Sequence, residues 1–167
     1  MVPRRLSHVK REIRVLGVVA RREDLGYLIV GIVFRGSLWL DGVLKAKSSS
    51  ADLTGAIVEM LRGSPHSRQV RVILLNRDML PGEASVSIKR LSDEAGNPVI
   101  ILGAASSGGG ETYTLVIGDD AVEYSTTDLG RWTAEDVLKA ATCEGIVPEA
   151  LRIAALTLSA LPEGEQT

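Results

Sequence analysis

The sequence has few of the residues that build disulfide frameworks and zinc sites. It contains one cysteine, Cys143, and two histidines, His8 and His66. A single thiol excludes an internal disulfide and is typical of a reducing compartment, so we expect a cytoplasmic protein. Neither histidine has cysteine or glutamate neighbours at the spacing of zinc ligands, which argues against a zinc site. No histidine lies near Cys143 in the sequence, so we interpret this residue as a buried or inert thiol.

Aromatic residues and long apolar runs are also scarce. Aromatics make up 4% of the chain and hydrophobic residues 45%, so aliphatic side chains must build most of the core. No apolar run reaches the ~18 residues that span a bilayer, and we expect no membrane association. The length of 167 residues favours one domain. Within it we expect a flexible basic N-terminal arm over 1–10, a glycine-rich loop over 104–111 and a frayed tail over 162–167.

The small net charge of −2 hides an uneven distribution. Residues 1–47 carry ten Lys or Arg against four acids, which gives +6 and leaves −8 for the remainder. Lysine and arginine bind nucleic-acid phosphates with release of counterions, so this segment is a candidate nucleic-acid surface. The candidates within it are Arg21, Arg22, Arg35, Lys45 and Lys47. Two alternatives stay open: solvated strand edges, or contact with the acidic half of another copy or of another protein.

Apolar periodicity and turn residues predict an α/β domain. Three strands at 13–20, 27–35 and 38–46 precede the first helix, and their short polar connections favour antiparallel pairing. A helix, a strand, a second helix and another strand follow, at 52–62, 70–75, 83–95 and 99–102. A hairpin over 112–124 and two helices near 133–142 and 148–161 complete the pattern. The order β-β-β-α-β-α-β is that of an RNase H-like mixed sheet.

The first of these strands carries nothing reactive. In nucleases built this way, the first strand normally has a metal-binding aspartate near its middle or end. The positions available here are Val18, Val19 and Ala20. The tryptophans Trp39 and Trp132 can stack on bases, but we favour core or partly buried packing for both.

Three blocks of sequence carry a resemblance to a known family. They are residues 7–17 (SHVKREIRVLG), residues 33–43 (VFRGSLWLDGV) and residues 146–154 (IVPEALRIA). Together they resemble an uncharacterised, mainly archaeal protein family that is distantly related to endonuclease V. The resemblance covers residues 7 to about 102 and again 131 to 161, and it implies the RNase H-like fold.

The resemblance also implies two-metal phosphodiester hydrolysis, which needs several carboxylates around Mg²⁺. Acids are expected in the first strand, before the first helix, after the fourth strand and in the second helix. The matching residues are Val19, Ala20, Asp52, Asn76 and Ser87, and Asp52 alone among them is an acid. The chain therefore reads as a degenerate member with no catalytic residues and no cofactor.

Nearby acids offer a route to a rebuilt site. Asp52, Asp78 and Asp41, with Asn76, could form a thin cluster that holds Mg²⁺ weakly. We favour a plainer interpretation in which Asp52 caps a helix, Asp78 lies in a loop and Asp41 shapes a turn with Gly42.

Three functions therefore remain, in order of preference. The first is a non-catalytic, endonuclease V-like protein that keeps a nucleic-acid- or nucleotide-binding surface. The second is an interaction or scaffold subunit, as a homodimer or with another protein, because the helix at 148–161 is apolar around much of its circumference. The third is a metal-dependent nuclease with a rebuilt site.

Overall fold

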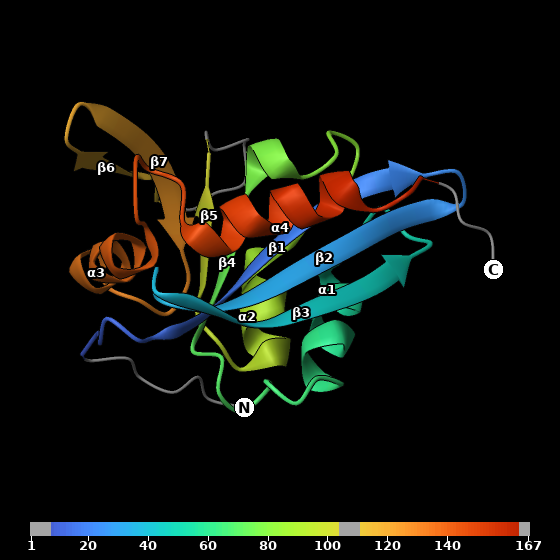
Figure 1. Cartoon of the computed structure of the whole chain (residues 1–167), viewed down its shortest axis with the longest axis horizontal. Coiled ribbons are helices and arrows are strands. Elements are labelled where there is room, and N and C mark those ends of the chain that lie inside the picture. The colour runs from blue at the N-terminus through green and yellow to red at the C-terminus, as the bar shows by residue number, and fades with distance from the viewer. Residues whose placement is uncertain (1–7, 104–110, 164–167) are drawn as a thin grey trace.

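The computed structural model describes residues 8–103 and 111–163. It contains a seven-stranded mixed sheet in the order β3-β2-β1-β4-β5-β7-β6 (Figure 1). The strands are Arg14–Glu23 (β1), Gly26–Arg35 (β2), Trp39–Ser48 (β3), Val72–Asn76 (β4), Val99–Leu102 (β5), Tyr113–Ile117 (β6) and Asp120–Thr126 (β7). The predicted RNase H-like α/β sheet is confirmed, and the glycine run at 104–110 lies outside the described residues.

The first three strands form an antiparallel meander. The apolar run of β1 stops at Arg21, but the strand continues to Glu23 because Arg21 and Arg22 still pair with Leu28 and Tyr27 of β2. Strand β2 is buried along nearly its whole length, as its apolar sequence predicts. Strand β3 is the outer edge of the sheet on this side.

Crossover helices add the parallel strands. β4 pairs in parallel with both β1 and β5. The helices are Thr54–Arg62 (α1), Ile88–Ala95 (α2), Arg131–Ala141 (α3) and Glu149–Ala160 (α4). Helix α2 begins later than the predicted residue 83, because the Ser87 hydroxyl accepts the Arg90 N–H at 3.3 Å and fixes the first turn there.

The helices cover opposite faces of the sheet. α1 and α2 pack on one face, and α4 runs along β1 and β2 on the other, with α3 at its side (Figure 1). A Cβ added to Gly17 of β1 would lie 2.6 Å from the carbonyl carbon of Ala150, so the helix backbone sits directly on the strand. None of the described helices is long and apolar enough to cross a membrane.

Three side chains lie further out than expected. Trp39 is 44% exposed and Trp132 is 72% exposed, so the predicted packing of both is wrong. Trp39 begins the edge strand β3, and Trp132 lies in the first turn of α3, so neighbouring elements cover each ring only in part. Cys143 follows the end of α3 and is exposed, not buried.

Candidate functional site

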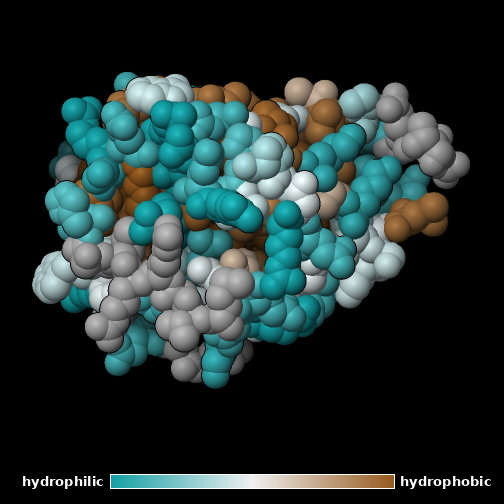
Figure 2. All heavy atoms as spheres, turned by 90° about the horizontal axis from the view of Figure 1, so that it is seen from below, coloured by the Kyte–Doolittle hydropathy of each residue, from teal (hydrophilic) through white to brown (hydrophobic). Residues whose placement is uncertain are grey.

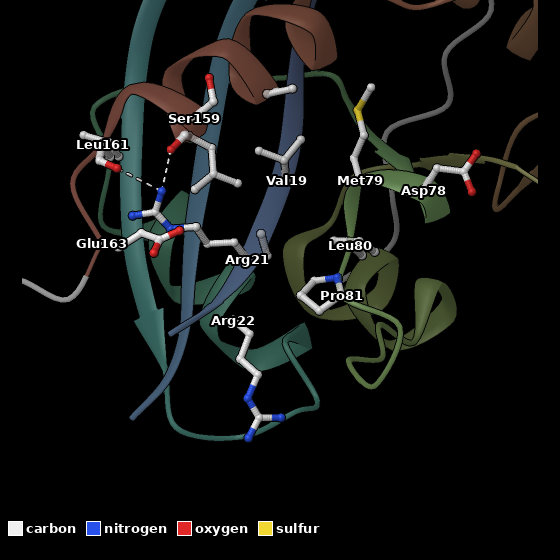
Figure 3. A pocket seen from close by; sticks show the side chains of 13 residues that line it. Val19, Arg21, Arg22, Asp78, Met79, Leu80, Pro81, Ser159, Leu161 and Glu163 are labelled. Carbon is white, nitrogen blue, oxygen red and sulfur yellow. Dashed lines mark hydrogen bonds between the residues drawn. The ribbon is translucent and has the colours of Figure 1, made fainter. Parts of the chain in front are cut away.

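The carboxyl ends of β1 and β4 border a hollow of about 710 Å³ (Figure 3). Its wall is mainly apolar at the strand ends where the family resemblance implies acidic residues. The apolar lining includes Val19, Ala20, Met79, Leu80, Pro81 and Leu158. We call this the apolar hollow.

The two arginines at the apolar hollow are bonded to other parts of the fold. Arg21 donates hydrogen bonds to the carbonyl oxygens of Leu158 at 2.7 Å and Leu161 at 2.9 Å. A cation at the last carbonyls of α4 also complements the helix dipole. Arg22 pairs with Glu83 at 3.2 Å and points away from the hollow (Figure 3).

Asn76 and Ser87 are occupied with backbone groups. The side-chain oxygen of Asn76 accepts the N–H of Asp78 at 2.9 Å and caps the 3-10 turn Arg77–Met79. Ser87 caps α2 in the same manner. Asp78 borders the hollow, but its carboxylate points away from Val19 (Figure 3).

Asp52 is held by three donors. Its Oδ1 accepts from the Thr54 N–H at 3.1 Å and the Thr54 hydroxyl at 2.7 Å, and its Oδ2 accepts from Arg90 at 2.9 Å. The Thr54 hydroxyl is the largest cause that holds the pKa of Asp52 below its ordinary value, and Arg90 adds to it. Thr54 Oγ1 also accepts the Ser87 N–H at 3.0 Å. Thr54 therefore connects Asp52 with Ser87, which are two of the positions where the family resemblance implies acids.

Asp41 lies at the other end of the sheet. The pairing of β2 with β3 moves from Val33–Gly42 to Phe34–Leu40, which makes Asp41 the extra residue of a β-bulge; this replaces the predicted turn. Asp41 accepts from the Nε of Arg14 at 2.8 Å and from the Nε of Arg35 at 2.8 Å.

Burial raises the pKa of Asp41. The hydrogen bonds from Arg35 and Arg14 lower it by more than burial raises it, so the pKa lies below its ordinary value. Arg14 is five residues before Val19 along β1, or about 16 Å. The structure therefore separates Asp41 from Asp52 and Asp78. Within 8–103 and 111–163, no group of three or more His, Cys, Asp or Glu residues could hold a metal ion.

The five predicted nucleic-acid-binding cations also separate. Arg21 and Lys47 flank Leu28 on neighbouring strands, and Lys45 lies on the same face of β3 as Lys47. Arg35 pairs with Arg14, which is about 23 Å away from Arg21 along β1. Lys45 and Lys47 are exposed, whereas Arg21 is committed to α4.

A second hollow, of about 450 Å³, opens at this Arg14 end. Its lining includes Lys10, Arg14, Arg68 and Arg71, with Glu12 as its one acid. We call it the basic hollow. Within the described part of the chain, Lys10, Arg68 and Arg71 make no ion pair.

Sequence reasoning missed Arg68 and Arg71 because both lie beyond the basic segment 1–47. A signal was present. Residues 68–71 stand directly before β4, and residues 10–14 lead into β1, so parallel pairing of the two strands brings both segments to one edge.

The basic hollow continues into a row of side chains that runs from the residue before β4 across β1, β2 and β3. The N–H of Arg71 donates to the carbonyl of Arg14 at 2.9 Å, Arg14 pairs with Arg35, and Arg35 pairs with Trp39. Side chains of directly paired residues lie on the same face of a sheet. We call Arg71, Arg14, Arg35 and Trp39 the cross-strand row.

Comparison with known proteins places this geometry in a family. Residues 11–108 match the model of the Endonuclease dU family. The chain belongs to the endonuclease dU family. A UPF0215 protein from Methanosarcina mazei is 30% identical over 95% of both chains. The predicted membership in an archaeal family related to endonuclease V is confirmed.

Two solved structures resemble this endonuclease dU family member. A protein of unknown function from Archaeoglobus fulgidus superposes with a TM-score of 0.72 and 25% identity, over 88% of this chain and 96% of that one. Ciona intestinalis endonuclease V, solved with a DNA that contains inosine, has a TM-score of 0.57 and 12% identity over 86% of this chain and 83% of its own. The second similarity shows a common fold.

Proposed function

We propose that this endonuclease dU family member binds nucleic acid without hydrolysing it. Hydrolysis by two metals requires several carboxylates that converge on the ions. At the positions where the family resemblance implies acids, this chain has Val19 in an apolar wall, and Asn76 and Ser87 as caps. The remaining acid, Asp52, is paired with Arg90. This arrangement supports a cleft that no longer collects metal ions.

The basic hollow is the surface that supports binding. One observation carries the proposal: Lys10, Arg68 and Arg71 border a single hollow and have no acidic partner among the described residues. Unpaired cations gathered at one place gain most from contact with phosphates, because each phosphate contact releases condensed counterions.

The ligand class follows from the extent of the basic surface. The cross-strand row carries cations beyond the hollow to β2, which favours a polymer of phosphates over a single nucleotide. The fold shared with an endonuclease V solved on DNA supports the same ligand class. The side shown in Figure 2 is mainly hydrophilic, with hydrophobic groups in separate patches, which suits contact with a charged ligand.

Binding of a fluorescent oligonucleotide, followed by anisotropy over a series of salt concentrations, tests the proposal. We expect affinity to fall steeply as salt rises. The double variant Arg68→Gln/Arg71→Gln should weaken binding and reduce the salt slope by about 1.4 for a single strand, at about 0.7 per lost phosphate contact. Lys89→Gln/Lys139→Gln removes the same charge from exposed sites on α2 and α3 and should leave both quantities unchanged.

Two results would overturn the proposal. One is the absence of binding by the native chain at about 50 mM salt, where phosphate contacts are strong. The other is cleavage of deaminated or branched DNA in the presence of Mg²⁺ or Mn²⁺, because that would require a working metal site.

A further inference from the structure

The cross-strand row ends on an exposed aromatic ring. Its arginines lie on β1, on β2 and directly before β4, and β3 presents Trp39, which is 44% exposed. Neighbouring strands are about 4.8 Å apart, so the row from Arg71 to Trp39 spans about 14 Å. A line of cations that leads to an open aromatic ring combines the two features with which proteins hold single-stranded nucleic acid.

The end of the row is held in place. The Nε of Arg35 donates to both carboxylate oxygens of Asp41, at 3.0 and 2.8 Å. The guanidinium carbon of Arg35 lies 5.3 Å from the centre of the Trp39 ring, within the range of a cation–π contact. Asp41 therefore fixes Arg35, and Arg35 in turn supports Trp39.

The terminal amino groups of two arginines remain available. Asp41 accepts from the Nε atoms of Arg14 and Arg35. Among the described residues, the Nη groups of both side chains make no further hydrogen bond. These groups have the fork geometry that suits phosphate oxygens.

We propose that the ligand is single-stranded nucleic acid, and that Trp39 stacks on one of its bases while Arg14, Arg35 and Arg71 contact phosphates. This inference rests on the proposed function and adds the strandedness of the ligand and the place where it binds. The bases of a duplex are stacked on one another and cannot lie on a tryptophan, whereas an unpaired base presents its face. The site lies at the opposite end of the sheet from the apolar hollow, because Arg14 begins β1.

The experiment compares Trp39→Ala, Trp39→Phe and the control Trp132→Ala for binding to a single strand of about 16 nucleotides and to its duplex. Trp39→Ala should weaken single-strand binding about 5- to 150-fold, the measured range for loss of one base–aromatic stack. Trp39→Phe should retain most of the affinity. Trp132→Ala removes the other tryptophan, which is more exposed at 72% and lies on α3, and should change nothing.

Tryptophan fluorescence gives a second readout that does not depend on a disruptive variant. The chain has two tryptophans, so Trp132→Phe leaves Trp39 as the single indole fluorophore. Titration with a DNA strand and with an RNA strand of the same sequence should quench this emission, and the strand whose titration has the lower midpoint concentration identifies the preferred sugar. A thermal melt of each variant confirms that it is folded.

The outcomes separate the two proposals. If the native chain binds neither single strands nor duplex, the proposed function and this inference both fail. If the native chain binds but Trp39→Ala leaves single-strand affinity unchanged, or weakens duplex binding equally, the inference fails and the proposed function stands. If anisotropy reports binding but the Trp39 emission is not quenched, the proposed stacking of Trp39 on a base is also overturned.

Discussion

The guanidinium of Arg90 lies 2.9 Å from the carboxylate of Asp52, so the one acid among the positions where the family resemblance implies metal ligands already has a cation beside it. The other carboxylate oxygen accepts two bonds from Thr54. A metal ion at Asp52 would have to displace Arg90, and no second carboxylate from the positions at Asn76 or Ser87 would help it.

Thr54→Val should raise the pKa of Asp52 toward its ordinary value. The Thr54 hydroxyl is the largest cause of the lowered pKa, and valine keeps the backbone N–H while removing the hydroxyl. Arg90→Gln should raise the same pKa by less. An NMR titration of the Asp52 carboxyl measures both changes, and a larger effect from Arg90→Gln would contradict the assignment.

The same pKa fixes the pH dependence of stability. A carboxyl whose folded pKa is lowered stabilises the fold above its unfolded value near 3.8, and this contribution is lost as pH falls through the folded pKa. Thr54→Val should therefore destabilise the protein by about 1–2 kcal/mol at neutral pH, because bonds to Asp52 and Ser87 disappear. Urea unfolding should show that the difference narrows below pH 3.8. A constant difference would contradict this account.

Val19→Asp should destabilise the fold without restoring a metal site. Val19 is 1% exposed in β1, and an unpaired carboxylate there costs about 3 kcal/mol or more. Val19→Ala is the control for lost packing alone. Thermal melts with and without Mg²⁺ measure the effect. A rise in the melting temperature of Val19→Asp on addition of Mg²⁺ would contradict the proposal that this cleft no longer binds metal ions.

Much of the fold can be predicted from local sequence signals. The apolar strands and their polar turns are short-range signals, and Gly96 in the left-handed conformation ends α2 where the sequence predicts. The start of α2 was placed too early because helical periodicity does not distinguish residues 83–87 from the helix proper. Tertiary bonds decided that boundary, since Thr54 binds the Ser87 N–H.

The site was harder to predict from the sequence, because each charged side chain bonds to partners that are far away along the chain. From the sequence alone Arg21 is interpreted as a free cation, but in the structure it bonds to carbonyl oxygens more than 130 residues later in the chain. Asp41 reads as a turn residue until the bulge directs it to Arg14 and Arg35. Arg68 and Arg71 became part of a basic surface through the parallel pairing of β4 with β1.

Gly17→Ala should destabilise the junction of β1 and α4. The added Cβ would lie 2.6 Å from the Ala150 carbonyl carbon and 2.8 Å from its Cβ, and neither atom belongs to a flexible side chain. Overpacking of this kind costs about 1–3 kcal/mol. Gly82→Ala is a matched control, since a Cβ there meets nothing within 4 Å, and chemical denaturation should show it near neutral. Equal stability of the two variants would contradict the close approach of helix and strand.

Asp41→Asn should have opposite effects on stability and on binding. The fold should lose about 1–3 kcal/mol at neutral pH, because Asp41 accepts charged hydrogen bonds from Arg14 and Arg35. Since its pKa is lowered in the folded state, this loss should shrink as pH falls below 3.8. Removal of the carboxylate also frees positive charge in the cross-strand row, so single-strand affinity at low salt should rise and the salt slope should steepen by up to about 0.7.

Asp52→Asn is the control for Asp41→Asn, because it removes the same charge beside Arg90, away from the row. Both variants gain one positive charge overall, so a general electrostatic effect would strengthen their binding equally. A selective gain for Asp41→Asn requires that the ligand lies on Arg14 and Arg35. Weaker binding by Asp41→Asn in a folded protein would instead mean that the carboxylate is needed to hold Arg35 against Trp39. Fluorescence of Trp39 in the Trp132→Phe background then decides between the two effects, because it reports whether the indole still meets the strand.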